Sequence, residues 1–289
     1  RFYMNTLILG SGFGLYGYLP SVVFFSKKIF LDKKYKNKFQ KRNILKKLEK
    51  KISWYGTLEK IIKEIDYLII AQNPLNQFDS LKKVLKFKKK LNHVFLEKPI
   101  HINPKKSLKV IRFLKKNNIK FSVGFIFEYL NWFVYLKKKK NLEIIWSIKK
   151  KNILSSWKYD KKRGGGLIRF YGIHFLKLFS DLNFNKVEKN ALLKNHWYLI
   201  VSDKKKNKIS LNIKYENKDK FIIKNENKIY LSKINPFGKM IKKNKIDPRV
   251  SVLKRYIYTK IKNSQNSASE YKTFVKFWQK VEKNINLKN

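Results

Sequence analysis

The sequence lacks cysteine, which excludes disulfide bonds and thiolate metal ligands. It has four histidines, no two of them spaced like a pair of metal ligands, so we expect no zinc site. A membrane-spanning run is absent too: the longest uncharged stretch is broken by glycines, a proline and serines, and the aromatic stretch 121–136 contains Glu128 and is too short for a bilayer. No signal-peptide pattern is visible. We therefore expect a protein of the reducing cytoplasm with no transmembrane segment.

Acidic residues are scarce as well. The chain has 19 Asp and Glu against 69 Lys and Arg, a formal charge of +50. Such a charge is typical of proteins that bind nucleic acid or anionic membranes. It is also what compositional drift produces, because Lys, Asn, Ile, Phe and Tyr are abundant, Ala, Gly and Pro are scarce, and lysines are spread along nearly the whole chain. We favour drift, since no helix-turn-helix, RNP or zinc-finger pattern indicates specific recognition of nucleic acid.

The chain contains enough apolar residues to form a large hydrophobic core. Of its 289 residues 43% are apolar, including 22 Phe and 16 Tyr, and this length fits one large or two ordinary domains. In the first part, short apolar runs alternate with helical patterns, which predicts an α/β fold with a doubly wound, Rossmann-type parallel sheet. We place this dinucleotide-binding domain at residues 1–122. The expected strands are 7–9, 28–31, 52–55, 66–71, 93–96 and 120–127.

The pattern changes beyond that domain. Residues 141–149 and 197–234 read as strands, the latter as several short strands joined by polar turns, which indicates a mainly antiparallel open sheet. An apolar helix is expected up to residue 182, and two more over 247–262 and 267–285. The second part, residues 123–289, is therefore predicted to be an α+β domain.

A glycine turn follows the first expected strand. Gly10, Ser11, Gly12, Phe13 and Gly14 stand between that strand and a helix start, the arrangement of a dinucleotide-binding unit that holds a pyrophosphate. The third glycine of the usual pattern falls at residue 15, which is leucine, although Gly14 is adjacent. The alternative is a structural turn that binds no ligand.

An acidic residue ends the second expected strand. Asp32 lies 20 residues beyond Gly12, where such folds place the carboxylate that binds the ribose hydroxyls of NAD. Lys33 and Lys34 follow at once and suit the 2′-phosphate of NADP, and an ordinary strand-end turn residue is a further alternative. We favour NAD over NADP.

Four segments now stand in a fixed order: the glycine turn at 10–14, Asn73-Pro74 after a strand, Glu97-Lys98-Pro99 after the next, and GGGLIRFYGIH at 164–174. In this order they resemble the glucose-fructose oxidoreductase and inositol 2-dehydrogenase family of NAD(P)-dependent oxidoreductases, most strongly over residues 6–182. The resemblance implies hydride transfer between NAD or NADP and a secondary alcohol or ketone of a sugar, sugar nucleotide or cyclitol. It also implies a substrate-binding and oligomerisation role for the second domain, in a homodimer or homotetramer. Asn73, Pro74, Glu97 and Lys98 join the glycine turn and Asp32 as expected cofactor contacts.

The resemblance assigns proton transfer to two residues. Lys98 corresponds to the lysine beside the nicotinamide, where alcohol oxidation needs a base and ketone reduction an acid. A desolvated lysine near a cationic ring has a lowered pKa, which suits this role. The Lys98-Pro99 bond is a candidate for the cis form. His174 corresponds to the second proton-transfer or substrate-binding group.

The chain departs from the family one helical turn before His174. Phe170 stands where the family has an aspartate that would orient the imidazole, and Lys177 on the other side would favour the neutral ring. Three alternatives follow: Lys98 carries catalysis with a neutral His174, another carboxylate substitutes, or the chain is a catalytically impaired accessory protein.

Further residues are expected near the substrate. Glu128 is the best substitute acid, with a surface carboxylate as the alternative. Lys158, in a Trp-Lys-Tyr-Asp segment, takes the place of a family arginine as a point charge. Of Arg169 and Tyr171, which flank position 170, we expect one to face the substrate. The predicted substrate contacts are Glu128, Lys158, Tyr171 and His174.

Overall fold

The computed structural model describes residues 4–87, 90–138, 140–150, 156–226, 228–238, 246–263 and 267–287. The chain forms two compact units, each assembled from three segments. The first comprises Arg1–His101, Lys109–Gly124 and Met240–Ser269, and the second Ile102–Leu108, Phe125–Lys239 and Glu270–Asn289. The predicted domain ranges 1–122 and 123–289 stay predictions.

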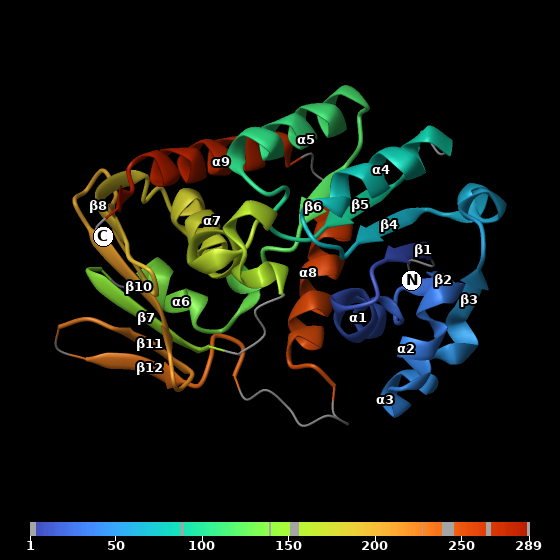
Figure 1. Ribbon diagram of the computed structural model, residues 1–289, viewed down its shortest axis with the longest axis horizontal. Coiled ribbons are helices and arrows are strands. Elements are labelled where there is room, and N and C mark those ends of the chain that lie inside the picture. Colours follow the sequence, from blue (N-terminus) through green and yellow to red (C-terminus); the bar gives the residue numbers. More distant parts are fainter. Residues whose placement is uncertain are drawn as a thin grey trace. The chain divides into compact units, whose positions relative to one another are not determined.

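The first unit contains a parallel sheet in the order β3-β2-β1-β4-β5-β6 (Figure 1). This is the strand order of dinucleotide-binding folds, in which the ligand binds where the order reverses, here between β1 and β4. The central strands are apolar and buried on both faces, as expected for a parallel sheet. The strands are β1 (Met4–Leu9), β2 (Ser26–Asp32), β3 (Ile52–Tyr55), β4 (Tyr67–Ile70), β5 (His93–Leu96) and β6 (Phe121–Val123).

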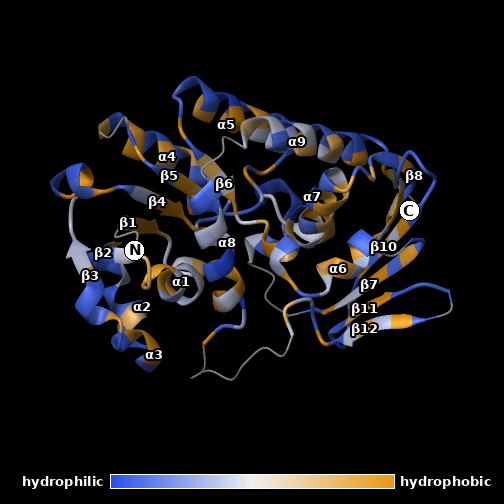
Figure 2. Cartoon of the chain, turned by 180° about the vertical axis from the view of Figure 1, so that it is seen from behind, coloured by the Kyte–Doolittle hydropathy of each residue, from blue (hydrophilic) through white to orange (hydrophobic). Residues whose placement is uncertain are grey.

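Helices α4 (Asn76–Phe87) and α5 (Pro104–Lys116) follow β4 and β5 and carry apolar stripes among lysines, visible as alternating colours in Figure 2. The helical segments on either side of β3 are short. The lysine-rich segment 37–51 breaks into α2 (Lys36–Gln40), α3 (Asn43–Lys46) and a 3₁₀ turn, because crowded like charges oppose a long helix. The segment 57–64 forms two 3₁₀ turns.

Helix α8 (Arg249–Asn263) adds a late part of the chain to the first unit. It packs against α1 (Leu19–Val22), and the Ser21 hydroxyl donates to the Val250 carbonyl at 3.2 Å. The rings of Phe25 and Tyr258 stack at 5.9 Å. The first unit is thus closed by residues far from its sheet in sequence.

The second unit contains a sheet in the order β12-β11-β7-β10-β9-β8-β13. Most pairs are antiparallel, whereas β7–β10 and β8–β13 are parallel. The predicted fold class, a Rossmann-type sheet plus an α+β part with a mainly antiparallel sheet, is confirmed. The strands are β7 (Leu142–Lys149), β8 (Lys186–Leu192), β9 (His196–Ser202), β10 (Lys208–Glu216), β11 (Lys220–Lys224), β12 (Ile229–Lys233) and β13 (Asn286–Leu287).

An aromatic core lies under one face of this sheet. Phe127, Trp132, Trp146, Phe175 and Phe221 contact one another at ring distances of 5.2 to 6.4 Å. The elements around the core are α6 (Phe133–Lys138), a π-helix (Leu167–Gly172) that runs directly into α7 (Ile173–Asp181), and α9 (Ala268–Lys283). The large core meets the expectation from the aromatic content.

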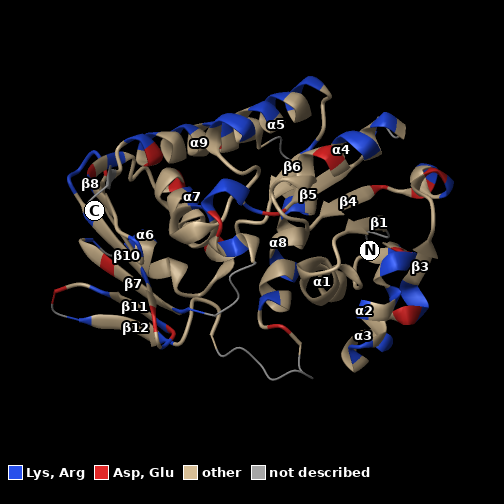
Figure 3. Ribbon diagram, in the orientation of Figure 1, with Lys and Arg blue, Asp and Glu red and all other residues tan. Residues whose placement is uncertain are grey.

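Lysines and arginines are spread over α2, α4, α5 and α9 and along the strands (Figure 3). Their distribution within each unit agrees with the compositional interpretation of the charge. In the part of the chain that the structure describes, no helix combines the length and apolarity needed to cross a membrane.

A buried histidine makes the first unit sensitive to acid. The His93 ring lies 4.6 Å from the Phe95 ring with a tilt of 39°, and its Nε2 lies 2.9 Å from the Ser122 hydroxyl. Burial, helped by Lys260 and Lys120, lowers the pKa of His93 to about 4. This folded-state pKa lies below the ordinary value of 6.5, so the unfolded chain binds the proton first as the pH falls.

We therefore expect the free energy of unfolding to fall by about 3 kcal/mol between pH 6.5 and pH 4 through this group. Urea unfolding across that range, followed by tryptophan fluorescence, measures the loss. His93→Gln keeps a partner for Ser122 but does not titrate, so its stability should fall less steeply. Parallel curves for the two proteins would contradict the assignment.

Candidate dinucleotide and proton-transfer site

The glycine turn begins where β1 ends. Gly10 has φ +134°, and a Cβ on it would collide with the Ala71 carbonyl, so only glycine fits. At Gly12 no atom lies within 4 Å of the position a Cβ would take, which leaves room for close approach of a phosphate. A Cβ on Gly14 would lie 3.2 Å from Ile8 Cγ2. Gly14 thus gives the tight packing against β1 that the pattern expects from its third glycine.

Two residues after β2 contact the glycine turn. The Lys38 ammonium donates to the Ser11 hydroxyl at 3.1 Å, and the Tyr35 hydroxyl accepts the Gly10 N–H at 3.2 Å. Lys38 brings a positive charge to the place where a pyrophosphate is expected. Sequence reasoning missed both residues, because no local pattern separates Lys38 from the many lysines around it.

A second cation reaches the turn from α8. The Arg249 guanidinium lies 4.3 Å from the centre of the Phe13 ring and forms an ion pair of 2.7 Å with Asp247. The Arg42 guanidinium lies 4.8 Å from the Tyr16 ring. The residues around the turn are therefore aromatic and cationic, which suits a cofactor with two phosphates.

Asp32 ends β2, as predicted, and its carboxylate contacts a residue two positions later in the chain. It accepts the Lys34 N–H at 2.9 Å and forms a 2.7 Å ion pair with the Lys34 ammonium. Asp32 therefore caps the 3₁₀ turn Lys33–Tyr35, as an ordinary strand-end residue does. Its contact with a ribose stays a prediction.

Asn73 and Pro74 follow β4 at the same edge of the sheet. The Asn73 side-chain oxygen accepts the N–H groups of Leu75 and Asn76, both at 3.1 Å. Asn73 thus fixes the start of α4. The roles of Asn73 and Pro74 in cofactor binding stay predictions.

The Glu97-Lys98-Pro99 turn follows β5, and its Lys98-Pro99 bond is cis. The buried Gln77 side chain holds this turn from α4: its amide nitrogen donates to the carbonyls of Glu97 at 3.0 Å and Pro99 at 3.1 Å, and its oxygen accepts the Glu97 N–H at 2.8 Å. One side chain therefore fixes the backbone on both sides of Lys98. Sequence reasoning missed Gln77, for which the only signal is a polar residue on the apolar stripe of α4.

The Glu97 carboxylate lies beside Lys98. It accepts the Tyr18 hydroxyl at 2.8 Å and the Lys98 N–H at 3.3 Å. Burial raises the pKa of Glu97, whereas Lys98, Tyr18 and Arg249 act in the opposite direction. Since β1, β4 and β5 are parallel neighbours, the first unit brings the glycine turn, Asn73 and Lys98 to the same edge of one sheet.

In the second unit His174 occupies the first turn of α7 and is buried. Its ring stacks on Phe127 with centroids 4.1 Å apart and an interplanar angle of 2°, and Phe125 meets it edge-on at 6.0 Å. The aromatic walls fix the plane of the imidazole. Its catalytic role, like that of Lys98, stays a prediction.

Position 170 lies in the π-helix, so the regular α-helical spacing assumed between Phe170 and His174 was wrong. The Phe170 ring packs edge-on against Trp157 at 5.3 Å and Tyr171 at 4.8 Å, and the Lys158 ammonium lies 5.4 Å from its centre. An aromatic cluster thus occupies the place of the family carboxylate.

Lys177 is buried and paired, and its expected effect on His174 stays a prediction. Its ammonium bonds to Asp181 at 2.5 to 2.6 Å and also to Glu270. Two carboxylates therefore balance its charge. Burial raises the pKa of Asp181, and Glu128 adds to the rise, which places Glu128 near this ion cluster. The role of Glu128 as a substrate contact stays a prediction.

Of the two residues that flank Phe170, Arg169 forms contacts within the fold. Its guanidinium binds Glu282 on α9 through two bonds of 2.6 and 2.7 Å and also donates to the Lys161 carbonyl at 3.0 Å. Burial raises the pKa of Tyr171, and Tyr215 adds to the rise, so its hydroxyl is neutral at physiological pH. Tyr171 stays a predicted substrate contact, as does the exposed Lys158.

No group of three or more His, Asp and Glu side chains in the described residues could hold a metal ion. The first unit therefore holds the glycine turn, the cationic residues around it and the Lys98 turn, and the second unit holds His174.

Residues 4–125 match the model of an oxidoreductase family with the NAD-binding Rossmann fold. This region belongs to that family. The match covers three of the four motifs and confirms the predicted family resemblance, and with it the enzyme class. NAD(P) as the cofactor type agrees with the same match. No curated protein sequence matched the chain significantly.

Solved structures share the fold over nearly the whole chain. A 3-ketoreductase from Actinomadura kijaniata, in complex with NADP and TDP-benzene, is 8% identical with a TM-score of 0.70 and coverage of 99% of this chain and 98% of that one. UDP-N-acetylglucosamine 3-dehydrogenase from Acidithiobacillus ferrooxidans is 12% identical with a TM-score of 0.70 and the same coverages. A dehydrogenase from Thermus thermophilus, in complex with NAD and UDP-GlcNAcA, is 12% identical with a TM-score of 0.68 and coverages of 99% and 96%.

Proposed function

We propose that the protein is an NAD(P)-dependent oxidoreductase that transfers hydride between the nicotinamide and a secondary alcohol or ketone of a sugar, sugar nucleotide or cyclitol. The observation that carries the proposal is the Lys98 turn, which Gln77 holds at the sheet edge where the glycine turn leaves open space at Gly12. The three similar structures named above include two complexes with nucleotide compounds and an enzyme named for a sugar nucleotide, which supports this substrate class.

Different residues bind the cofactor, transfer the proton and position the substrate. The backbone of residues 10–14, with Lys38 beside it, binds the pyrophosphate, while Asp32, Asn73, Pro74 and Glu97 complete the cofactor site. A bound nicotinamide supplies the hydride acceptor or donor. Lys98 moves the proton at the substrate oxygen, taking it as a neutral amine in oxidation and giving it as an ammonium in reduction. His174 is the second group at that oxygen, and Glu128, Lys158 and Tyr171 position the substrate.

Two measurements test the function. NADH or NADPH titration, followed by quenching of the six tryptophans, reports cofactor binding. Absorbance at the nicotinamide band during incubation with sugars, cyclitols and sugar nucleotides reports turnover. The proposal expects both, and absence of cofactor binding would overturn it.

We also propose that NAD is preferred over NADP, because the Asp32 carboxylate at the end of β2 suits ribose hydroxyls and repels a 2′-phosphate. Asp32→Ala is expected to weaken NAD binding about tenfold, by loss of one charged hydrogen-bond acceptor, and NADP binding less. Fluorescence titration with both cofactors measures the two constants. Asp79→Ala, at an exposed carboxylate on α4, makes the same change in net charge and should alter neither. Equal losses for NAD and NADP in Asp32→Ala would remove the ribose assignment.

A catalytically impaired accessory protein is the second candidate, and the packing of Phe170 favours it. Trp157 and Tyr171 enclose a ring where the family has a carboxylate. This candidate expects cofactor binding without turnover across the whole substrate panel. Turnover of any member of the panel would exclude it.

A further inference from the structure

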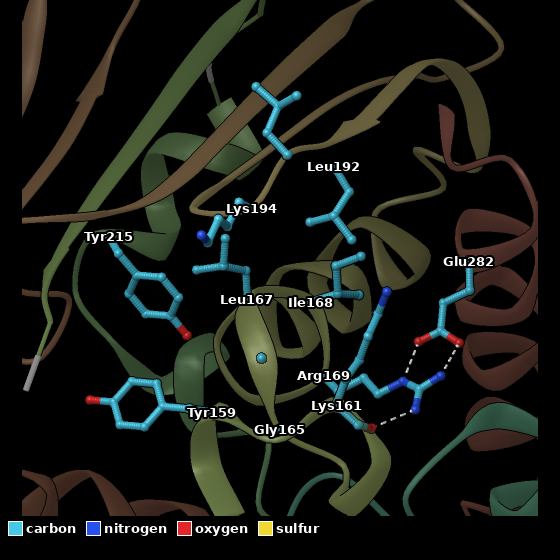
Figure 4. A pocket seen from close by; sticks show the side chains of 12 residues that line it. Tyr159, Lys161, Gly165, Leu167, Ile168, Arg169, Leu192, Lys194, Tyr215 and Glu282 are labelled. Carbon is cyan, nitrogen blue, oxygen red and sulfur yellow. Dashed lines mark hydrogen bonds and ion pairs between the residues drawn. The ribbon is translucent and has the colours of Figure 1, made fainter. Parts of the chain in front are cut away.

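A cavity of about 460 Å³ lies within the second unit (Figure 4). Its volume falls in the range of about 300 to 1,000 Å³ that is usual for small-molecule sites. Its walls come from the segment after β7, the π-helix, the β8–β9 turn, β10 and the end of α9. The lining residues are Tyr159, Lys161, Gly165, Gly166, Leu167, Ile168, Arg169, Leu192, Leu193, Lys194, Tyr215 and Glu282.

The walls are apolar and aromatic. In Figure 4 Ile168 and Leu192 lie on one side and Tyr159 and Tyr215 on the other, with Leu167 between them. The two tyrosine rings are 5.7 Å apart and tilted by 60°. Such walls suit a flat or cyclic organic group.

The charges of the cavity are unbalanced. Arg169 and Glu282 neutralise each other through their paired bonds. Lys161 and Lys194 come from different segments, and the described residues include no ion pair for either. The lining therefore carries two positive charges without acidic partners, which favours an anion with at least two negative charges.

The triple glycine provides open backbone beside these charges. Gly166 has φ +86°, and no atom lies within 4 Å of the position that a Cβ would take. A Cβ on Gly165 would collide with the Trp157 carbonyl, which fixes the course of the loop. A ligand can therefore approach the backbone at Gly166 closely.

We propose that this cavity binds the nucleoside diphosphate group of a sugar nucleotide, with the phosphates at Lys161 and Lys194 and the nucleoside against the leucines and tyrosines. This inference rests on the proposed function and narrows its substrate class. A free sugar or cyclitol has neither the charge nor the flat ring that these walls suit. The π-helix that supplies Leu167, Ile168 and Arg169 to the cavity wall is followed directly by α7, which carries His174.

The test uses the full chain and UDP as the probe, with uridine as the uncharged comparison, in isothermal titration calorimetry. UDP is expected to bind, and uridine at least tenfold more weakly. The double variant Lys161→Met/Lys194→Met is expected to weaken UDP binding at least tenfold. Lys204→Met/Lys218→Met, at exposed lysines in two turns, makes the same charge change and should alter it less than twofold.

A second variant separates the cavity from the general positive charge of the chain, which binds polyanions non-specifically. Leu193 lines the cavity and is 40% exposed, so Leu193→Trp is expected to fill its mouth without changing any charge. UDP binding should fall at least tenfold in this variant. Equal losses in the two lysine double variants, or unchanged binding in Leu193→Trp, would overturn the proposal.

The failure of this inference and that of the proposed function are distinguishable. If UDP binding follows the expected pattern while NADH and NADPH do not bind, the cavity stands and the oxidoreductase proposal fails. If free sugars turn over and UDP does not bind, the oxidoreductase proposal stands and the cavity assignment fails.

Discussion

Lys98→Met is expected to lower kcat by a factor of about 10² to 10⁴, the range for losing a positioned proton-transfer group. Methionine keeps the length and apolar stem of the side chain but carries no proton. The cofactor should bind as before, because the backbone of the turn is held by Gln77 and not by the Lys98 ammonium. Steady-state rates on the best substrate of the panel, together with NADH titration, measure the two effects.

Lys105→Met, an exposed lysine in the first turn of α5, is the matched control and should keep full activity. A Lys98→Met enzyme that retained most of its kcat would show that another group moves the proton. Loss of NADH binding along with activity would show a structural role for Lys98.

Gln77→Leu is expected to reduce the free energy of unfolding by about 3 to 5 kcal/mol and also to lower kcat. Leucine has similar volume but leaves three backbone groups of the Glu97–Pro99 turn without their partner, each costing about 1 to 3 kcal/mol when buried. The turn that carries Lys98 would then lose its fixed position. Urea unfolding and steady-state kinetics measure the two effects.

Asn76→Ala is the control for Gln77→Leu, because Asn76 is the exposed neighbour in the first turn of α4. It should change stability by less than about 0.5 kcal/mol. Gln77→Glu offers a second comparison, since it keeps the acceptor for the Glu97 N–H but loses both donors. If Gln77→Leu were as stable and as active as the parent protein, Gln77 would not position Lys98.

The sequence predicted the parallel sheet because its strands are continuous apolar runs that end in turn residues. The runs at 66–71 and 93–96 correspond closely to β4 and β5. The glycine turn was recognisable because both glycines stand directly after the first strand: Gly10 is required by its backbone conformation, and Gly12 leaves open space beside it. These are local signals, and local reasoning recovers them.

Other features depend on distant parts of the chain. Strand β8 was missed because it is largely exposed and reads as polar. The helix 247–262 was predicted, but its place in the first unit comes from contacts of Ser21 and Phe25 with α8. Pairwise contacts of this kind leave no pattern in a single sequence.

The same holds for the candidate site. The order of motifs pointed to Lys98 and His174, whereas Gln77 and Lys38 emerged only from their contacts. The pairing of Lys177 with Asp181 and Glu270 likewise emerged only from the contacts. Residues that belong to a local motif can be predicted from the sequence. Residues that act through contacts with distant segments cannot.

The most direct test of the proposed chemistry is a crystal structure of the protein with NAD and a bound sugar nucleotide. It should show the pyrophosphate on the backbone of residues 10–14, with the Lys98 ammonium and a His174 ring nitrogen both about 3 Å from the reacting oxygen. A structure with NAD bound there but either group well away from that oxygen would contradict the assignment of proton transfer to Lys98 and His174.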